Sequence, residues 1–190
     1  MNILFTGVGG QGVVLAGKVL MNAAINAGFN AKETKIHGMA QRGGSVDCHV
    51  RYSKGDLYSP LIPKGTVNYI VSCEMLELMR RLDYLAADGT VIANLLQIDP
   101  VPVQIGAAEY PSDLSDWLKK NMPNYIEIDS AAALEEVGSK RVINIMMLGV
   151  LSKYLEFTQE HWEKAIESIV KDSSRELNLN AFRMGQKLGA

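Results

Sequence analysis

Cysteine is scarce in this chain, which has only Cys48 and Cys73 among its 190 residues. Two isolated thiols are more often free, buried residues of a protein in a reducing cytosol than partners in a disulfide. An iron–sulfur cluster usually needs four cysteine ligands, so the chain is not expected to hold one by itself. We therefore predict a cytoplasmic protein with no metal site of its own.

An excess of one charge and a long apolar run are missing as well. The chain has 19 lysines and arginines against 21 aspartates and glutamates, a formal net charge of -2, which gives no broad basic surface for nucleic acid. No apolar run approaches the roughly 18–20 residues of a membrane span. The first residues also lack the basic region and cleavage site of a signal peptide. We expect no nucleic-acid partner, no membrane partner and no leader.

Hydrophobic residues make up 47% of the chain, enough for one well-packed core and little for two. Their spacing predicts strands at 2–6, 30–36, 45–52, 67–72, 90–94, 101–105 and 125–128, and helices at 11–27, 74–87, 112–120, 131–137, 141–154, 158–170 and 174–188. Asp88-Gly89 is interpreted as a turn before the strand at 90–94. Residues 1–190 are thus predicted to form one Rossmann-like, three-layer α/β domain with a mostly parallel sheet and a helical C-terminal third.

A glycine-rich turn follows the first predicted strand. Residues 7–12, Gly-Val-Gly-Gly-Gln-Gly, fit the pattern G-x-G-x-x-G, whose glycines permit a tight turn and close packing of the next helix. Free N–H groups at the start of that helix favour an anion, so a phosphate or carboxylate is the first interpretation. NAD or FAD is the second, although Glu33, the acidic residue about 20 positions on that a Rossmann site needs, falls inside the second strand. A purely structural turn is the third.

A second glycine-rich stretch, residues 37–45, joins the second and third predicted strands with the sequence His-Gly-Met-Ala-Gln-Arg-Gly-Gly-Ser. The second strand should bring it to the same sheet edge as the first glycine turn, and ligands of open α/β sheets bind at that edge. Arg42 followed by Gly43 and Gly44 would place a guanidinium beside exposed N–H groups, a combination that holds carboxylate or phosphate. Alternatively, Arg42 pairs with a nearby acid and His37 satisfies a backbone carbonyl.

These two stretches, together with Ser59-Pro-Leu-Ile-Pro63, resemble the gamma-type component of 2-oxoacid:ferredoxin oxidoreductases. The similarity continues through Glu74-Met-Leu-Glu77 and Asn94 to Asn144 and residues 178–182, so it spans nearly the whole chain. His-Gly-Met-Ala-Gln at 37–41 is typical of the indolepyruvate branch, whereas relatives that use pyruvate or 2-oxoglutarate usually carry a Tyr-Gly-Pro-Glu-like sequence there.

The resemblance implies a division of labour between subunits. Such an enzyme oxidatively decarboxylates an arylpyruvate to an aryl-acetyl-CoA and passes two electrons to ferredoxin. In such an enzyme, thiamine diphosphate and the [4Fe–4S] clusters are bound by a large partner subunit. Ferredoxin binds to the assembled complex and is a partner of this chain only in that sense. CoA is then the anionic reactant that the thiamine subunit does not already hold. We expect this chain to contribute to a CoA site that it shares with the partner.

Three other functions stay open. The chain could serve the same role in an enzyme for pyruvate, 2-oxoglutarate or a branched-chain 2-oxoacid. It could be a free-standing NAD(P)- or FAD-dependent enzyme, which only the glycine pattern favours. It could also be a non-catalytic assembly subunit that binds a nucleotide.

Site residues follow from the two glycine-rich stretches. Those expected to contact the shared ligand are Gly7, Gly9, Gly10, Gln11, Gly12, Arg42, Gly43, Gly44 and Ser45, with Gln11 and Ser45 as neutral donors. No nucleophile or acid–base pair is evident, and His37 and Arg42 are candidates for direct chemistry by residue type, as are Glu33 and Glu74. The segment 57–63 either docks on the partner or packs over its own sheet, and residues 145–148 are expected to be core.

Overall fold

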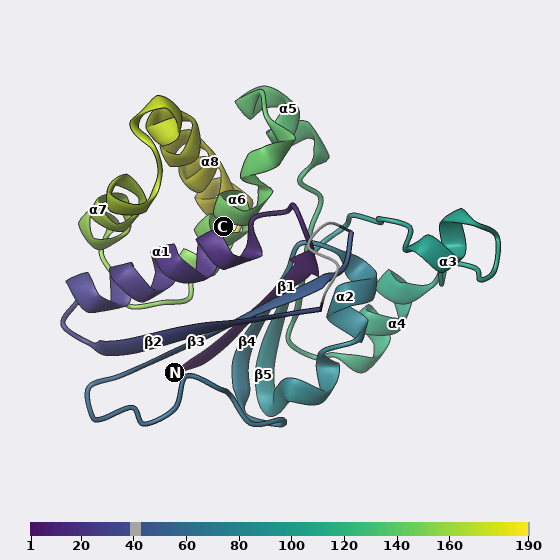
Figure 1. Cartoon of the computed structure of the whole chain (residues 1–190), viewed down its shortest axis with the longest axis horizontal. Coiled ribbons are helices and arrows are strands. Elements are labelled where there is room, and N and C mark those ends of the chain that lie inside the picture. Colours follow the sequence, from purple (N-terminus) through teal and green to yellow (C-terminus); the bar gives the residue numbers. More distant parts are fainter. Residues whose placement is uncertain (39–42, 190) are drawn as a thin grey trace.

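The computed structural model describes residues 1–38 and 43–189 (Figure 1). They build one sheet of six strands in the order β2-β3-β1-β4-β5-β6. The strands are β1 (Asn2–Val8), β2 (Asn30–His37), β3 (Ser45–Ser53), β4 (Val67–Ser72), β5 (Leu85–Asn94) and β6 (Tyr125–Ile128). Near-continuous apolar runs in β1 and β4 suit the middle of a sheet that is covered on both faces.

Strand directions explain how the two glycine-rich stretches meet. β1, β4, β5 and β6 pair in parallel, whereas β3 runs antiparallel to both β1 and β2. Two reversals bring β2 back to the direction of β1, so both strands end at the same edge of the sheet. The prediction that this stretch reaches the edge of the first glycine turn is confirmed for its described residues, 37–38 and 43–45.

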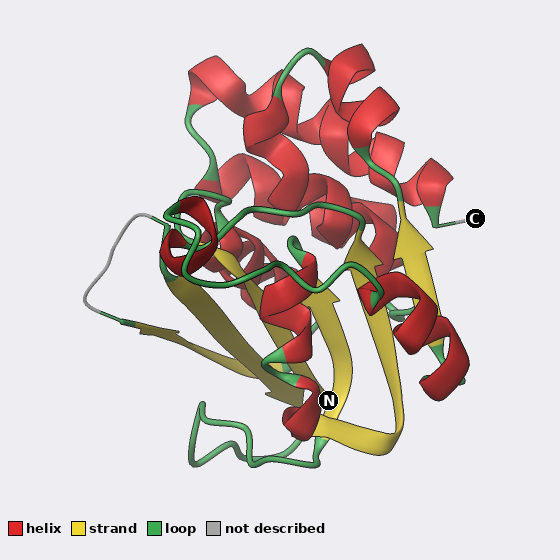
Figure 2. Ribbon diagram, turned by 90° about the vertical axis from the view of Figure 1, so that its right-hand side faces the viewer, coloured by secondary structure: helices red, strands yellow, loops and turns green. Residues whose placement is uncertain are grey.

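Helices cover both faces of the sheet (Figure 2). One face carries α1 (Val13–Asn26), α6 (Ile143–Ser152), α7 (Gln159–Ile169) and α8 (Arg175–Leu188), which share the larger hydrophobic core. The other face carries α2 (Met75–Met79) and α4 (Leu114–Asn121) over a smaller core. The remaining helices are α3 (Val101–Gln104), α5 (Ala131–Val137) and the 3-10 turns Leu82–Tyr84, Lys140–Val142 and Asp172–Ser174. The predicted three-layer domain with a helical C-terminal third is confirmed.

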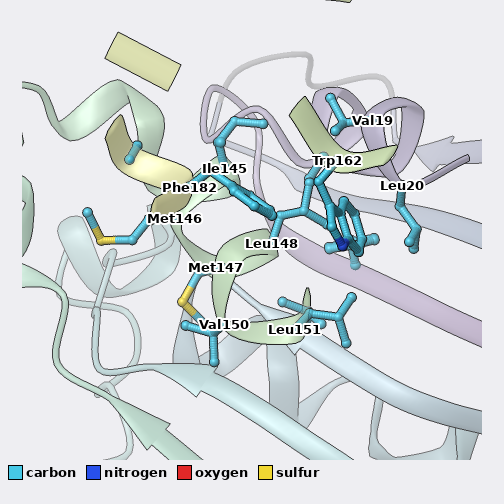
Figure 3. Close-up of a cluster of buried hydrophobic side chains, with 14 of the residues drawn as sticks. Val19, Leu20, Ile145, Met146, Met147, Leu148, Val150, Leu151, Trp162 and Phe182 are labelled. Carbon is cyan, nitrogen blue, oxygen red and sulfur yellow. The ribbon is translucent and has the colours of Figure 1, made fainter. Parts of the chain in front are cut away.

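The C-terminal helices pack unusually closely where α6 crosses α8. A Cβ added at Gly185 would lie 1.9 Å from the carbonyl oxygen of Met146, and one added at Gly149 would lie 2.1 Å from that of Phe182. Around this crossing, the side chains of α6 point into the cluster that holds Trp162 (Figure 3). Residues 145–148 are fully buried, as predicted from their apolar character.

The predicted strand at 101–105 is wrong, because this segment forms the short helix α3. Pro100 caps the helix and Pro102 lies in its first turn, where a missing N–H costs nothing and a fixed φ is already helical. Val101 and Ile105 are exposed by 64% and 72%, and the segment is not part of the described six-stranded sheet. A short apolar run does not by itself distinguish a strand from a helix.

The predicted helix at 74–87 is too long, and the predicted turn at Asp88-Gly89 lies inside β5. α2 ends at Met79, and β5 already begins at Leu85, which pairs with Val67 of β4. The register then shifts before Tyr69 pairs with Thr90. In this irregularity Gly89 packs so closely on β4 that a Cβ would lie 2.8 Å from the carbonyl oxygen of Val67.

The segment 57–63 packs over its own sheet at one point. Ile62 is buried, and its N–H donates to Nδ1 of His49 at 3.1 Å. Burial lowers the pKa of His49, which keeps the ring neutral and able to accept this bond. Arg51 donates to the carbonyl oxygens of Ser59 and Leu61, whereas the Tyr58 side chain is 89% exposed. A partner contact through Tyr58 stays a prediction.

We expect Gly185→Ala to lower the free energy of unfolding by about 1–3 kcal/mol, the usual cost of overpacking a tight contact. Urea unfolding followed by circular dichroism measures the change. Gly55→Ala is the matched control, since its Cβ would meet nothing closer than the Ser53 hydroxyl at 3.8 Å. Equal stabilities of the two variants would contradict the close crossing of α6 and α8.

Candidate functional site

The glycine turn at the end of β1 is held from inside by the side chain of Gln11. Its Oε1 accepts from the N–H of Val8 at 2.7 Å, and its Nε2 donates to the carbonyl of Cys73 at 3.1 Å. Gly10 and Gly12 have φ values of 110° and 75°, which favour glycine. Gln11, expected to be a donor to the ligand, thus has its side-chain amide turned into the protein, where it fixes the turn.

Close packing explains two other glycines of the turn. A Cβ on Gly7 would lie 2.6 Å from Oε1 of Gln11, and one on Gly12 would lie 2.7 Å from Nδ2 of Asn144. The same Asn144 nitrogen donates to the carbonyl of Gly12 at 2.9 Å. The start of α1 is therefore attached to the start of α6, 132 residues further along the chain.

The second glycine-rich stretch pairs directly with the first. The N–H of Gly9 donates to the carbonyl of Gly44 at 2.8 Å, and that of Gly43 donates to the carbonyl of Gly9 at 3.3 Å. The structure thus brings Gly9, Gly43 and Gly44 together, as the predicted course of the second strand indicated. Arg42 lies outside the described residues, and its role in binding or chemistry stays a prediction.

A cavity of about 440 Å³ opens beside the turn. Its wall consists of Val8, Gly9, Gly10, Gly12, Val13, Val14, Lys35, His37 and Val46. The N–H groups of Gly10, Gly12, Val13 and Val14 have no acceptor among the described residues. These donors lie at the N-terminus of α1, a 14-residue helix, where the helix dipole favours negative charge.

Two basic side chains from the end of β2 line the same cavity. Lys35 and His37 are exposed and alternate with Ile36, so both face the α1 side of the sheet. Nδ1 of His37 lies 3.0 Å from the carbonyl oxygen of Gly38, which is one of the two interpretations given for this residue. The sequence analysis did not predict Lys35 as a site residue. Its position two residues before His37 on a strand indicates that both side chains lie on the same face. A cation beside N–H donors that have no acceptor among the described residues is an arrangement that can hold an anion.

Ser45 lies at the edge of the site but its side chain has another partner. Its Oγ accepts from Nη2 of Arg81 at 3.0 Å, and Nε of the same guanidinium is paired with the buried carboxylate of Asp47 at 2.5 Å. The other oxygen of Asp47 accepts from Thr6 at 2.7 Å. This cluster lies on the face of the sheet opposite the cavity, so it supports the strand ends and does not line the anion site.

The acidic candidates have structural partners. Glu33 lies within β2, four residues before its end, and its Oε2 accepts from the Cys48 thiol at 3.5 Å. Glu74 is buried and caps α2, while its second oxygen accepts from Tyr110 at 2.6 Å and from the N–H of Ile98 at 3.2 Å. Glu33 lies inside its strand, and both carboxylate oxygens of Glu74 accept hydrogen bonds from the protein, so neither is placed like the ribose-binding carboxylate of a dinucleotide site.

Both cysteines are buried and unpaired. Burial raises the pKa of the Cys73 thiol to about 12, and burial together with the carboxylate of Glu33 raises that of Cys48. Within residues 1–38 and 43–189, no group of three or more His, Cys, Asp or Glu side chains could hold a metal ion. None of the helices described there is long and apolar enough to cross a membrane.

Comparison with known proteins gives consistent matches over the whole chain. The sequence matches the family pyruvate ferredoxin/flavodoxin oxidoreductase over residues 2–188. It is 38% identical to indolepyruvate oxidoreductase subunit IorB of Archaeoglobus fulgidus, covering 97% of this chain and 93% of that one. It is 30% identical to 2-oxoglutarate synthase subunit KorC of Methanothermobacter marburgensis, covering 98% and 95%.

A solved structure agrees with these sequence matches. The gamma subunit of a keto/oxoacid ferredoxin oxidoreductase from Geobacter sulfurreducens superposes with a TM-score of 0.71 at 25% identity. The superposition covers 99% of this chain and 97% of that one. The fold and nearly full-length correspondence thus extend beyond the glycine-rich motifs.

Replacing Gln11 by leucine tests the internal support of the turn. We expect Gln11→Leu to lower the free energy of unfolding by about 2–4 kcal/mol, because the N–H of Val8 and the carbonyl of Cys73 lose their buried partner. The measurement is chemical unfolding, with Gln97→Leu as control because the exposed Gln97 side chain has Asp99 as its one hydrogen-bond partner among the described residues. A Gln11 variant as stable as the Gln97 variant would rule out this architectural role.

Proposed function

Because this chain belongs to the pyruvate ferredoxin/flavodoxin oxidoreductase family, we propose that it is the small subunit of an indolepyruvate:ferredoxin oxidoreductase. The assembled enzyme would oxidatively decarboxylate an arylpyruvate to an aryl-acetyl-CoA in the cytoplasm and reduce ferredoxin. The higher identity to an indolepyruvate oxidoreductase subunit, 38% against 30% for a 2-oxoglutarate synthase subunit, carries the choice of an aryl substrate. The sequence His-Gly-Met-Ala-Gln at 37–41 supports the same choice.

Redox chemistry and decarboxylation are assigned in this proposal to a large partner subunit with thiamine diphosphate and [4Fe–4S] clusters. The residues of this chain do not fit either group. Its two thiols are buried, on β3 and just after β4, and their raised pKa values oppose the thiolate form that binds iron. Asp88-Gly89, the nearest approach to a thiamine-binding sequence, belongs to the irregular part of β5.

CoA is the reactant that we assign to the glycine turn. CoA carries several phosphate groups, and the turn offers four N–H donors, Lys35 and His37 around one cavity. Phosphate at a helix N-terminus gains from both the donors and the dipole. Arg42, next to Gly43 in the loop that pairs with Gly9, is proposed as a further cation of this site. The chain's role is then to bind and orient CoA toward the partner's reaction centre.

Reconstitution tests the assignment of the enzyme. The chain, coexpressed with the large subunit encoded by the same organism, should co-purify with it and reduce ferredoxin in the presence of CoA and a 2-oxoacid. We expect kcat/KM for indolepyruvate to exceed that for pyruvate or 2-oxoglutarate by at least about ten-fold, a ratio that one well-fitted side-chain pocket supplies. A preference for 2-oxoglutarate would replace the aryl assignment, and failure to form any complex would refute the subunit role.

Lys35→Gln tests the CoA site. We expect the KM for CoA to rise about five-fold, or roughly 1 kcal/mol, because a charge-assisted contact is lost at a solvent-exposed site. The KM for the arylpyruvate should stay unchanged. Lys32→Gln is the matched control, since Lys32 is exposed on the same strand but lies on its other side, where it lines a different hollow with Tyr58.

Arg42→Ala should act in the same direction as Lys35→Gln, with partial recovery in Arg42→Lys, which keeps the charge but loses the planar fork. Equal effects of the Lys32 and Lys35 substitutions, or an effect confined to the arylpyruvate, would contradict CoA binding at the turn.

A further inference from the structure

Residues 99–109 form an arm that carries α3 at one end of the molecule's longest axis (Figure 1). Val101 and Ile105 are exposed on it, and among the described large hydrophobic side chains only Tyr58 is more exposed. Neither side chain belongs to the two hydrophobic cores that the described residues form. From 100 to 108 the arm has no charged residue, and Gln104 is its one polar side chain. Apolar groups gathered on an exposed, uncharged segment indicate a contact surface.

One buried carboxylate holds both ends of the arm. Oε1 of Glu74 accepts from the N–H of Ile98 at 3.2 Å and from the hydroxyl of Tyr110 at 2.6 Å. The Tyr110 oxygen in turn accepts from the N–H of Leu76 at 3.1 Å. Because Glu74 also caps α2, the base of the arm is attached to that helix and the arm leaves the domain in a fixed direction.

The arm is also ordered from within. The N–H groups of Ala107 and Ala108 both donate to the carbonyl of Pro102, at 2.8 and 3.1 Å. Nε2 of Gln104 donates to the carbonyl of Asp99 at 2.6 Å. Pro102 further restricts the backbone by its fixed φ. A segment that is ordered before binding loses little conformational freedom in a complex, so more of its contact energy becomes affinity.

The charges beside the arm are all negative. Asp99 and Glu109 lie at its two ends and Asp113 follows it, and none of these exposed carboxylates forms an ion pair with a described residue. Between Arg81 and Lys119 the sequence has no lysine, arginine or histidine. A complementary surface therefore has an apolar hollow bordered by cations. Two copies of this chain that met through their arms would place acids against acids, which disfavours a second copy as the occupant.

The apolar surface continues at the base of the arm. A hollow of about 190 Å³ lies there, and its wall includes Tyr110, Pro111, Leu95 and Leu96. Both leucines are exposed. A partner that receives the arm would cover this hollow as well, and the area removed from water would grow accordingly.

We propose that the arm inserts into the large partner subunit, in an apolar hollow bordered by lysines or arginines. The existence of this partner rests on the proposed function, and the arm adds which surface of the chain meets it. Val101 and Ile105 become buried in the contact, while Asp99 and Glu109 pair with the cations of the border. None of these residues lines the cavity beside the glycine turn, so the contact leaves that cavity open.

Binding of the purified chain to the purified large subunit of the same organism tests the apolar contact. We expect Ile105→Gln to raise the dissociation constant about ten-fold, because a side chain central to the contact is lost. Ile25→Gln is the matched control, since Ile25 is also an exposed isoleucine, lies on α1 and belongs to neither described core. Equal affinities of the two variants would overturn the assignment of the arm.

Charge reversal tests the chemistry of the border. We expect Glu109→Lys to slow association about five-fold at low salt, and the difference should shrink at about 0.5 M salt, because charges at the rim of a contact mainly steer the encounter and salt screens them. Glu167→Lys on α7 is the control, since Glu167 is exposed and has no ion pair among the described residues. Equal slowing by both substitutions would contradict a cationic border at the arm.

Two further outcomes separate this contact from the proposed function. If the wild-type chain binds the large subunit and Ile105→Gln binds equally well, the arm is wrongly assigned while the subunit role stands. If the wild-type chain does not bind it at all, the subunit role is refuted and the contact with it. Sedimentation of the chain alone completes the test, because self-association that Ile105→Gln abolishes would make a second copy the occupant and overturn the proposal.

Discussion

The carbonyl oxygen of Cys73 holds together the edge of the sheet at which the glycine turn lies. It accepts from Nε2 of Gln11 at 3.1 Å and from Nδ2 of Asn94 at 3.3 Å, so it connects the ends of β1, β4 and β5. The same Gln11 amide receives the N–H of Val8, and the N–H of Cys73 donates to the carbonyl of Thr6 at 3.0 Å. Because these groups are buried, each lost bond would leave an unpaired partner inside the protein. The position of the glycine turn is thus set by contacts beneath it, before any ligand is bound.

Much of the fold was predictable, because periodicity and turn chemistry are local properties of a sequence. In β3, the alternation of Val46, Cys48 and Val50 with Asp47 and His49 gave the correct faces of the strand. The alternation did not predict that Asp47 and His49 are also buried, because the residues that cover these two side chains lie further along the chain. Arg81 reaches Asp47 from 34 positions away, and Ile62 lies over His49. The misplaced strand at 101–105 has the same origin, because neighbours in space decide the state of a short apolar run.

The candidate site was predictable in part for a similar reason. Gly9, Gly43 and Gly44 meet as the motifs indicated, since strand direction alone brings both loops to one edge. Lys35 escaped notice because a lysine on an edge strand is common and its cavity is formed by α1. Gln11 and Ser45 belong to the motifs, yet their side chains serve the protein's interior rather than the cavity. The motifs therefore predicted which segments meet beside the cavity, but they did not separate residues that line the cavity from residues that hold its wall in place.

β2 is the outermost strand of the sheet, next to β3, and this position affects how readily the chain aggregates. One side of β2 pairs with β3, and on the other side no strand lies beside it in the part of the chain that the structure describes. Such an open edge can recruit strands from other molecules, and lysines are a common means of preventing this. Lys32 and Lys35 both lie on β2 and are exposed. Lys35 therefore lies both in the wall of the first cavity and on the open edge of the sheet, where its charge opposes pairing with strands of other molecules.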